Sequence, residues 1–173
     1  GPLLHNVVQQ FLYQVRWGEL DYLVADLPPG TGDVQLTMVQ SVPLAGGLVV
    51  TTPQDVALAD ARKAIMMFRQ VEVPVLGVVE NMSYFVCPHC SRRSDIFSHG
   101  GGKRVAERYE VPFLGEIPLE VAVREGGDVG RSIVLEQPES EAAKAFLAVS
   151  ERLAAGLSTA NLRAGGTVAL ETE

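Results

Sequence analysis

The strongest constraint on this chain is the alternation of short, continuously apolar runs with segments whose apolar residues recur at helical spacing. The apolar runs, each as long as one strand, are residues 20–27, 47–52, 73–79 and 111–117. A strand that is apolar at every position, rather than at every second one, is typical of a parallel sheet buried on both faces. The pattern therefore predicts an α/β fold, a mostly parallel sheet with helices on both faces.

Helical spacing of apolar residues predicts the helices that connect these strands, at residues 4–16, 33–41, 55–71, 101–108 and 140–157. We find no internal repeat and no low-complexity linker, which favours a single domain over residues 1–157. Residues 84–98 show no regular period and are expected to form a small irregular insertion. The last stretch, residues 158–173, is expected to be a flexible tail.

Composition narrows the range of partners. The chain has 173 residues, of which 47% are hydrophobic and 20% charged, as in a globular domain. Its net charge of -7 and the lack of a basic block argue against general nucleic-acid binding. No apolar run approaches the roughly 18 residues that a membrane span needs, and no secretion signal is recognisable. We therefore expect a cytoplasmic protein that binds neither nucleic acid nor membrane.

The first candidate site follows the apolar run 20–27, where Asp26 precedes a turn of sequence PPGTGD. Ligands of open α/β sheets bind beyond the carboxyl ends of the strands, and an acidic side chain there suits a Mg²⁺ ion near a phosphate. Gly30 and Gly32, with Thr31 between them, would expose backbone amides to such a phosphate. Taken alone, a carboxylate at a strand end is more often a helix cap or a turn former.

A second candidate site combines Asn81, which follows the run 73–79, with Pro118 and Glu120, which follow the run 111–117. An asparagine amide can pair with the N6/N7 edge of adenine, and the other two residues could line the opposite side of a base pocket. The simpler alternative is that Asn81 and Pro118 only end their strands, since asparagine tolerates turns and proline interrupts sheet pairing.

The third candidate is the pair Cys87 and Cys90, the two cysteines of the chain, spaced as CxxC. Zinc with His89 and His99 as further ligands is one reading, although structural zinc usually takes four protein ligands. A redox pair is a second, but that motif should open a helix after a strand. A third is an iron–sulfur cluster shared by two chains, whose two CxxC pairs would supply four thiolates. The nearby HGGGK sequence at residues 99–103 is more readily a glycine-rich entry to a helix than a phosphate loop.

Taken together, these segments resemble a known family. The chain contains, in this order, the strings WGELDYLVADLPPGTGDVQLT, TTPQDVALADARKAIMMF, GVVENMSYFVCPHC and HGGGKRVAE. They are similar to the Mrp/ApbC family of iron–sulfur cluster carriers, a MinD-like branch of the P-loop ATPases. The resemblance implies that Asp26 is the Mg²⁺-associated aspartate and that Cys87 and Cys90 hold a cluster, of the [4Fe–4S] type, between the subunits of a homodimer. It further implies contacts with ATP and Mg²⁺ from Gly30, Thr31, Gly32 and Asn81, to which the reading of the strand ends adds Pro118 and Glu120.

The resemblance also implies delivery of the cluster to apo iron–sulfur proteins, coupled to ATP binding and hydrolysis. One departure is large, because the GKGGVGKS-like phosphate loop of the family does not occur in this sequence. We therefore expect the chain to correspond to the carboxy-terminal part of a family member, with a sheet incomplete at its N-terminal side, and not to hydrolyse ATP appreciably by itself. Alternative functions are a MinD/ParA-like positioning ATPase and a zinc-stabilised binding module.

Overall fold

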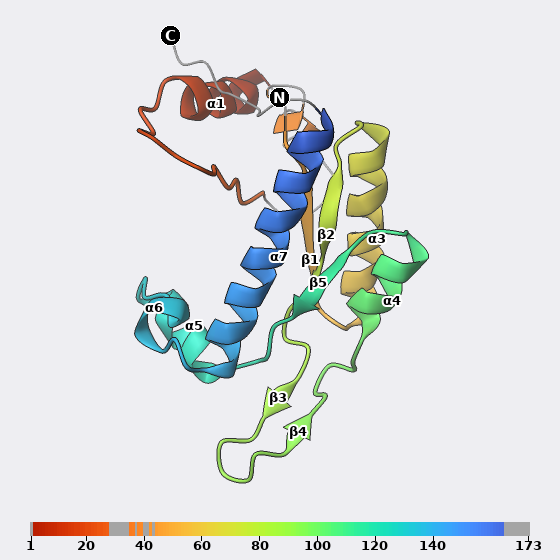
Figure 1. Cartoon of the computed structure of the whole chain (residues 1–173), viewed down its shortest axis with the longest axis vertical. Coiled ribbons are helices and arrows are strands. Elements are labelled where there is room, and N and C mark those ends of the chain that lie inside the picture. The colour runs from red at the N-terminus through yellow and green to blue at the C-terminus, as the bar shows by residue number, and fades with distance from the viewer. Residues whose placement is uncertain (1, 28–34, 37, 40–41, 43, 165–173) are drawn as a thin grey trace.

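The computed structural model describes residues 2–27, 35–36, 38–39, 42 and 44–164, and its centre is a three-stranded sheet (Figure 1). The strands, in their spatial order, are β1 (Gly47–Thr51), β2 (Val75–Glu80) and β5 (Phe113–Glu116). Both pairings are parallel, so the carboxyl ends of all three strands meet at one edge. The predicted parallel sheet is confirmed, and each of these strands lies within one residue or two of its predicted apolar run.

Helices cover both faces of this sheet, as predicted. They are α3 (Asp55–Gln70) and α4 (Gly101–Arg108) on one face, and α7 (Glu141–Ala164) on the other (Figure 1). Val78 and Val79 are neighbours on β2 and point to opposite faces, so one joins the core under α3 and α4 and the other joins the core under α7. A strand buried from both sides needs apolar side chains at successive positions, which explains the continuous runs.

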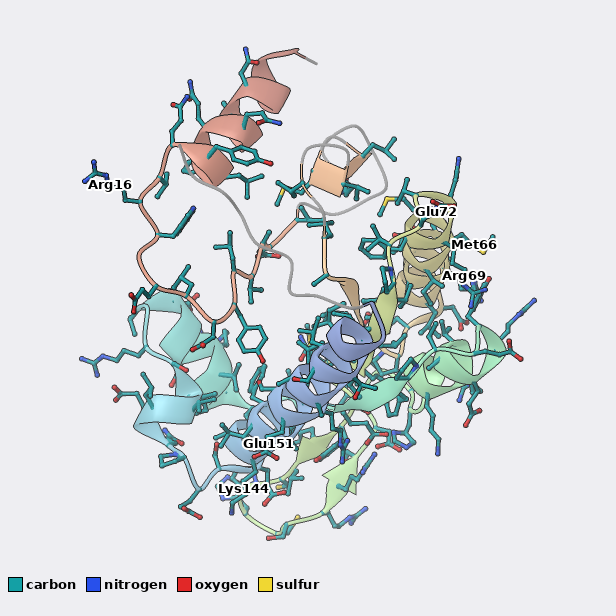
Figure 2. The ribbon with its side chains drawn as sticks, turned by 45° about the horizontal axis from the view of Figure 1, so that its top comes forward. Arg16, Met66, Arg69, Glu72, Lys144 and Glu151 are labelled. Atoms are coloured by element: carbon teal, nitrogen blue, oxygen red, sulfur yellow. The ribbon has the colours of Figure 1, made fainter. Side chains whose placement is uncertain are left out.

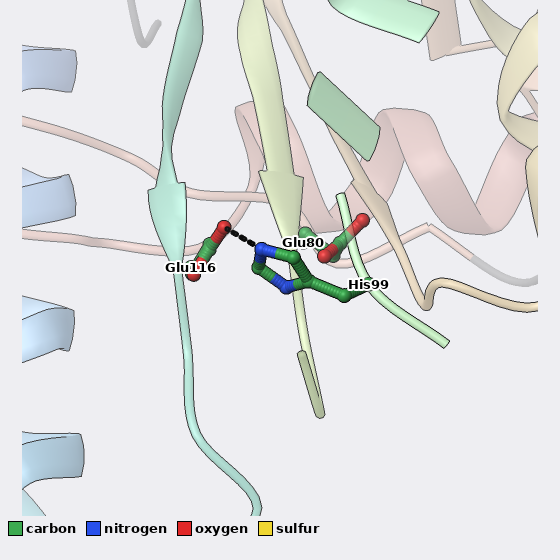
Figure 3. Close-up of side chains that lie close together, drawn as sticks. All are labelled: Glu80, His99 and Glu116. Atoms are coloured by element: carbon green, nitrogen blue, oxygen red, sulfur yellow. Dashed lines mark ion pairs between the residues drawn. The ribbon is translucent and has the colours of Figure 1, made fainter. Parts of the chain in front are cut away.

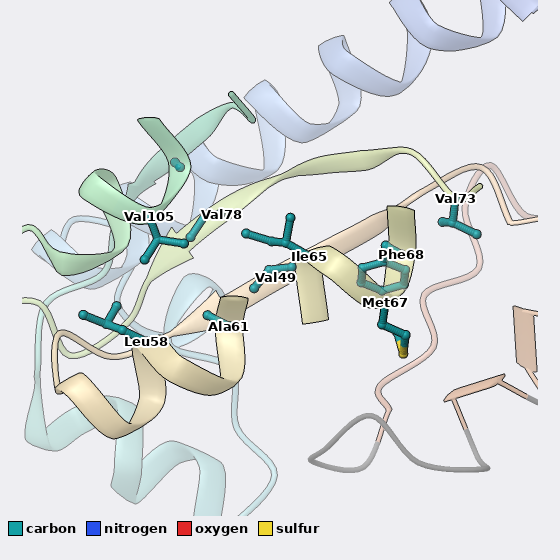
Figure 4. Packing of buried hydrophobic residues seen from close by; sticks show 10 residues of the cluster. Val49, Leu58, Ala61, Ile65, Met67, Phe68, Val73, Val78 and Val105 are labelled. Carbon is teal, nitrogen blue, oxygen red and sulfur yellow. The ribbon is translucent and has the colours of Figure 1, made fainter. Parts of the chain in front are cut away.

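The larger core fills the space between the sheet and α3 (Figure 4). Ile65 of α3 is fully buried there, and Phe68, one turn further along the helix, lies over the start of β1. A Cβ atom on Gly47 would lie 2.5 Å from the Phe68 ring, so the absence of a side chain at this position lets the ring approach the strand. On the other face, Lys144 and Glu151 lie on the exposed side of α7 (Figure 2).

At the N-terminal side, α1 (Pro2–Tyr13) confirms the predicted first helix and ends three residues earlier than residue 16. Its residue Leu12 is buried against Met38, from the predicted helix 33–41, and against Val42, which follows that segment. That segment is helical at residues 35, 36, 38 and 39, where the structure describes it. The glycines at 30 and 32 and the threonine at 31 lie outside the described residues.

The predicted strand at 20–27 is wrong: this segment is irregular, and most of its apolar side chains are exposed, with Val24 at 86%, while Leu27 is half-buried. A strand requires a hydrogen-bonded neighbour, and an apolar run alone does not supply one. Among the described residues, β1 is paired along only one of its edges, with β2, and no strand lies beside 20–27. The apolar pattern is present here without the pairing that would make it a strand.

The segment expected to be irregular contains a short antiparallel hairpin, β3 (Phe85–Val86) and β4 (Arg93–Ser94), which extends from the carboxyl edge of the sheet (Figure 1). Two further helices were not predicted, α5 (Val121–Asp128) and α6 (Ile133–Glu136). Helix α7 continues to Ala164, into the stretch that was expected to be a tail. In the described part of the chain, no helix has both the length and the apolar character needed to cross a membrane.

Candidate functional site

Both cysteines lie in the turn between β3 and β4, at the tip of the hairpin. The Cys87 N–H donates to the Arg92 carbonyl at 3.0 Å, and the Ser91 N–H donates back to the Cys87 carbonyl at 2.8 Å. Ser91 adopts a left-handed conformation, with φ of 55°, which closes the turn. The two thiols are not joined in a disulfide, and Cys87 is half-buried while Cys90 is exposed. The hairpin therefore presents two free thiols two residues apart at its outer end.

The turn also favours the thiolate form of Cys87. Hydrogen bonds from the backbone of His89, then from the backbone and side chain of Cys90, lower the pKa of the Cys87 thiol, while slight burial opposes the shift. Backbone amides that point at a sulfur atom stabilise its negative charge. Because the thiolate is the form that binds metals and reacts with electrophiles, the turn prepares Cys87 for ligation.

This arrangement predicts the pH dependence of Cys87 alkylation in the reduced, metal-free protein. The rate with iodoacetamide should rise at lower pH in the folded chain than in the chain unfolded in urea, where the turn is lost and the thiol has its ordinary pKa. Mass spectrometry of the Cys87 peptide measures the rate from pH 6 to pH 10. Cys90→Ala removes one side-chain donor and should move the folded curve part of the way back. Coincident curves for folded and unfolded wild-type chains would contradict the prediction.

At the foot of the hairpin, the fully buried carboxylate of Glu80 ends β2. Its Oε1 accepts hydrogen bonds from the Ser83 hydroxyl at 2.6 Å and the Gly100 N–H at 3.0 Å, and its Oε2 accepts one from the Gly102 N–H at 2.5 Å. A Cβ atom on Gly102 would lie 3.1 Å from the Glu80 Cβ, so glycine allows this close approach. The anion at the start of α4 is thus an internal carboxylate, which supports the helix-entry reading of residues 99–103 over phosphate binding.

Glu80, His99 and Glu116 come together beside this carboxylate (Figure 3), with donor atoms within 4.8 Å of one another. By distance alone they could hold a metal ion, but Glu80 already accepts three hydrogen bonds. The Arg93 guanidinium also lies 2.9 Å from His99 Nδ1 and 3.6 Å from Glu116 Oε2. Since a guanidinium keeps its charge at all accessible pH values, Arg93 is the cation of this group.

The same geometry bears on the zinc reading of the CxxC pair. Within the described part of the chain, the one group of three His, Cys, Asp or Glu donors that could share a metal contains neither cysteine. His99, which we considered as a zinc ligand, is engaged with Arg93, and His89 is exposed beside the thiols. At the hairpin tip, the described part of one chain therefore supplies two thiolates to a metal. The remaining ligands must come from outside this part of the chain.

The residues predicted to contact ATP are placed as follows. Asn81 and Pro118 follow the neighbouring strands β2 and β5 at the same edge of the sheet. The Asn81 side-chain oxygen accepts the Met82 N–H at 2.9 Å, and the Glu120 carboxylate accepts the Ala142 N–H, at the start of α7, at 2.9 Å. Asp26 is exposed on the irregular segment 20–27. The side chains of Asn81 and Glu120 thus have partners within the described part of the protein, and the ATP-binding roles of all these residues stay predictions. A hollow of about 200 Å³ between α5 and α6 contains none of these residues.

Comparison with known proteins agrees with the fold. In solved structures, a nucleotide-binding protein of Archaeoglobus fulgidus in complex with ADP matches with a TM-score of 0.70 and 42% identity, over 80% of this chain and 56% of that one. The cell division ATPase MinD of Pyrococcus furiosus matches with a TM-score of 0.64 and 27% identity, over 88% of this chain and 57% of that one. These likenesses confirm the MinD-like P-loop NTPase fold class.

Comparison of sequences identifies the family. An iron-sulfur cluster carrier protein of Synechocystis sp. is 55% identical over 163 residues, which make up 94% of this chain and 46% of that protein. The chain thus spans about half the length of the curated relatives it matches. A family model described as ParA, NUBPL iron-transfer P-loop NTPase, matches residues 1–154. Because this match covers most of the chain, the protein belongs to the family of NUBPL-type iron-transfer P-loop NTPases.

Proposed function

We propose that this protein carries an iron–sulfur cluster between two copies of the chain and delivers it to apo iron–sulfur proteins. The observation that carries the proposal is the hairpin tip, where Cys87 and Cys90 are free and no third protein ligand of the same chain completes the site within the described residues. A [4Fe–4S] cluster takes four thiolates, which two such hairpins supply in a homodimer. The names of close relatives support the same cargo.

ATP belongs to the proposal for the whole protein rather than for the residues described. The similarity to an ADP complex and to P-loop NTPases supports nucleotide binding. When bound, ATP with Mg²⁺ would supply binding and hydrolysis energy for cluster loading or release. We propose Asp26, Gly30, Thr31, Gly32, Asn81, Pro118 and Glu120 as the residues that face the nucleotide in the intact, cytoplasmic protein.

Anaerobic reconstitution with ferrous iron and sulfide tests the proposal. We expect a brown protein with about four iron and four sulfide per two chains, which elutes at the mass of a dimer only when it is loaded. Iron and sulfide analysis, together with size-exclusion chromatography, measures this. Tightly bound zinc without sulfide, in a monomer, would instead establish the zinc-stabilised module. Failure to retain any metal would favour a MinD/ParA-like positioning ATPase, whose chemistry does not require thiolates.

A further inference from the structure

The two arms of the cysteine hairpin are attached to the domain in different ways. The arm that leads to the thiols is held by the backbone: the Ser83 N–H donates to the Ile117 carbonyl at 3.0 Å, and the Leu119 N–H donates to the Tyr84 carbonyl at 2.7 Å. These bonds join it to the segment that follows β5. The arm that returns from the thiols begins with β4, and the Arg93 side chain of this strand reaches Glu116 at the sheet edge.

Arg93 makes several contacts at once. Its guanidinium lies over the Tyr84 ring, with Cζ 3.9 Å from the ring centroid, and donates to Asp95 from Nε at 3.2 Å. Its Nη2 reaches His99 Nδ1 at 2.9 Å and Glu116 Oε2 at 3.6 Å. One planar group thus joins the returning arm to the other arm, to the loop before α4 and to β5.

The charges around Arg93 favour this position. An arginine N–H can only donate, so His99 Nδ1 accepts, and the second ring nitrogen, Nε2, lies 3.7 Å from Glu116 Oε1. Burial raises the pKa of the Tyr84 hydroxyl, the carboxylate of Glu141 adds to this shift, and the positive charge of Arg93 opposes it. Arg93 is 44% exposed, so each contact is individually weak, and what the group provides is a defined orientation.

We propose that Arg93 is a positioning residue that fixes the orientation of the Cys87–Cys90 hairpin relative to the carboxyl edge of the sheet. The inference rests on the proposed function, because orientation matters where two hairpins must present four thiolates to one cluster. Ordering two mobile hairpins on binding would cost conformational entropy, and a hairpin already held by Arg93 avoids much of that cost. Cluster retention should therefore depend on a side chain that does not touch the cluster.

Distance measurement in the metal-free chain tests the positioning directly. In a Cys87→Ser, Glu151→Cys background, nitroxide labels on Cys90 and on the exposed α7 position report the distance from the hairpin tip to the domain. We expect a narrow distribution with Arg93 and a clearly broader one in Arg93→Gln. The matched control is Arg92→Gln, which removes the same charge at the neighbouring position. The Arg92 side chain has no partner among the described residues. Equal widths in all three proteins, or equal broadening in both variants, would overturn the inference.

Iron release separates this inference from the proposed function. In the reconstituted chain, Arg93→Gln should load the same iron and unfold at the same temperature as wild type, yet lose iron to a ferrous chelator roughly 10-fold faster. Arg93→Lys keeps the charge but not the planar group, so its rate of iron release should lie between those of wild type and Arg93→Gln. An unchanged release rate in Arg93→Gln would overturn the role of Arg93 in retention. If wild type itself loads no cluster, the proposed function fails, while the distance distributions still decide whether Arg93 holds the hairpin.

Discussion

Replacing Cys87 and Cys90 together with serine is expected to abolish retention of iron and sulfide after anaerobic reconstitution. A serine hydroxyl stays protonated near neutral pH and is a poor ligand for iron, whereas the thiolate is the form that binds a cluster. Each single replacement leaves two thiolates in a dimer of hairpins and should also lose most of the cluster. Iron and sulfide analysis per chain, with the absorbance of the cluster, measures the effect.

The loss should occur without unfolding, because both thiols lie at the outer end of the hairpin and belong to none of the hydrophobic clusters of the described residues. The urea midpoint of the double variant should therefore match that of wild type. His89→Ala is the matched control, since it changes one of the two residues between the cysteines. A cluster carrier should keep its iron in this variant, whereas a zinc module that uses His89 should lose its metal. Unchanged iron and sulfide in the double cysteine variant would contradict the proposed function.

Most of the sheet could be predicted because a strand buried on two faces is apolar at successive positions of the sequence. Val78 and Val79 point to opposite cores, so both must be apolar, and the run 73–79 has no polar position to break it. Helix α4 was predicted at its observed bounds, since glycines precede its apolar positions. Helix α5 was missed because Gly126 and Gly127 lower its helical propensity. A Cβ atom at Gly126 would lie 2.5 Å from the Arg131 carbonyl oxygen, so the turn that follows requires glycine there.

The segment 20–27 shows that an apolar run does not by itself indicate a paired strand. Its centre, residues 22–25, is as apolar as β1 or β2, and yet Val24 is 86% exposed and no strand lies beside it among the described residues. A sequence window reports the side chains of one strand, whereas pairing depends on a neighbour that can be far away in the chain. Burial and pairing must both be available before such a run becomes a strand.

The parts of the candidate site whose residues are close together in the sequence were predicted. The parts that depend on residues far apart in the sequence were missed. The CxxC pair marks its own turn, because both ligands lie within four residues. The role of Glu80 depends instead on the amides of Gly100 and Gly102, some twenty positions later, which sequence spacing does not connect to it. The one available signal was a charged residue at the end of a fully apolar run, which must find donors if it is buried.

Removing the Glu80 carboxylate is expected to destabilise the domain strongly. Glu80→Ala leaves the N–H groups of Gly100 and Gly102 and the Ser83 hydroxyl without their buried acceptor, and should lower the free energy of unfolding by about 3–5 kcal/mol. Glu80→Gln keeps one oxygen but turns an NH₂ group toward a backbone N–H, so we expect a loss of about 2 kcal/mol. Urea unfolding followed by circular dichroism measures both values.

Hydrogen exchange locates the loss of stability within the domain. The Glu80 carboxylate holds the amides at the start of α4, so these amides should respond more than those of the sheet. In Glu80→Gln, the amides of Gly100 and Gly102 should exchange faster, by a factor larger than the loss of global stability alone allows. Glu107→Gln is the matched control: it makes the same chemical change on the exposed side of α4, and should alter stability by no more than about 0.5 kcal/mol. If Glu80→Gln behaved like this control, the buried carboxylate would not be what holds the glycine-rich loop and the foot of the cysteine hairpin to β2.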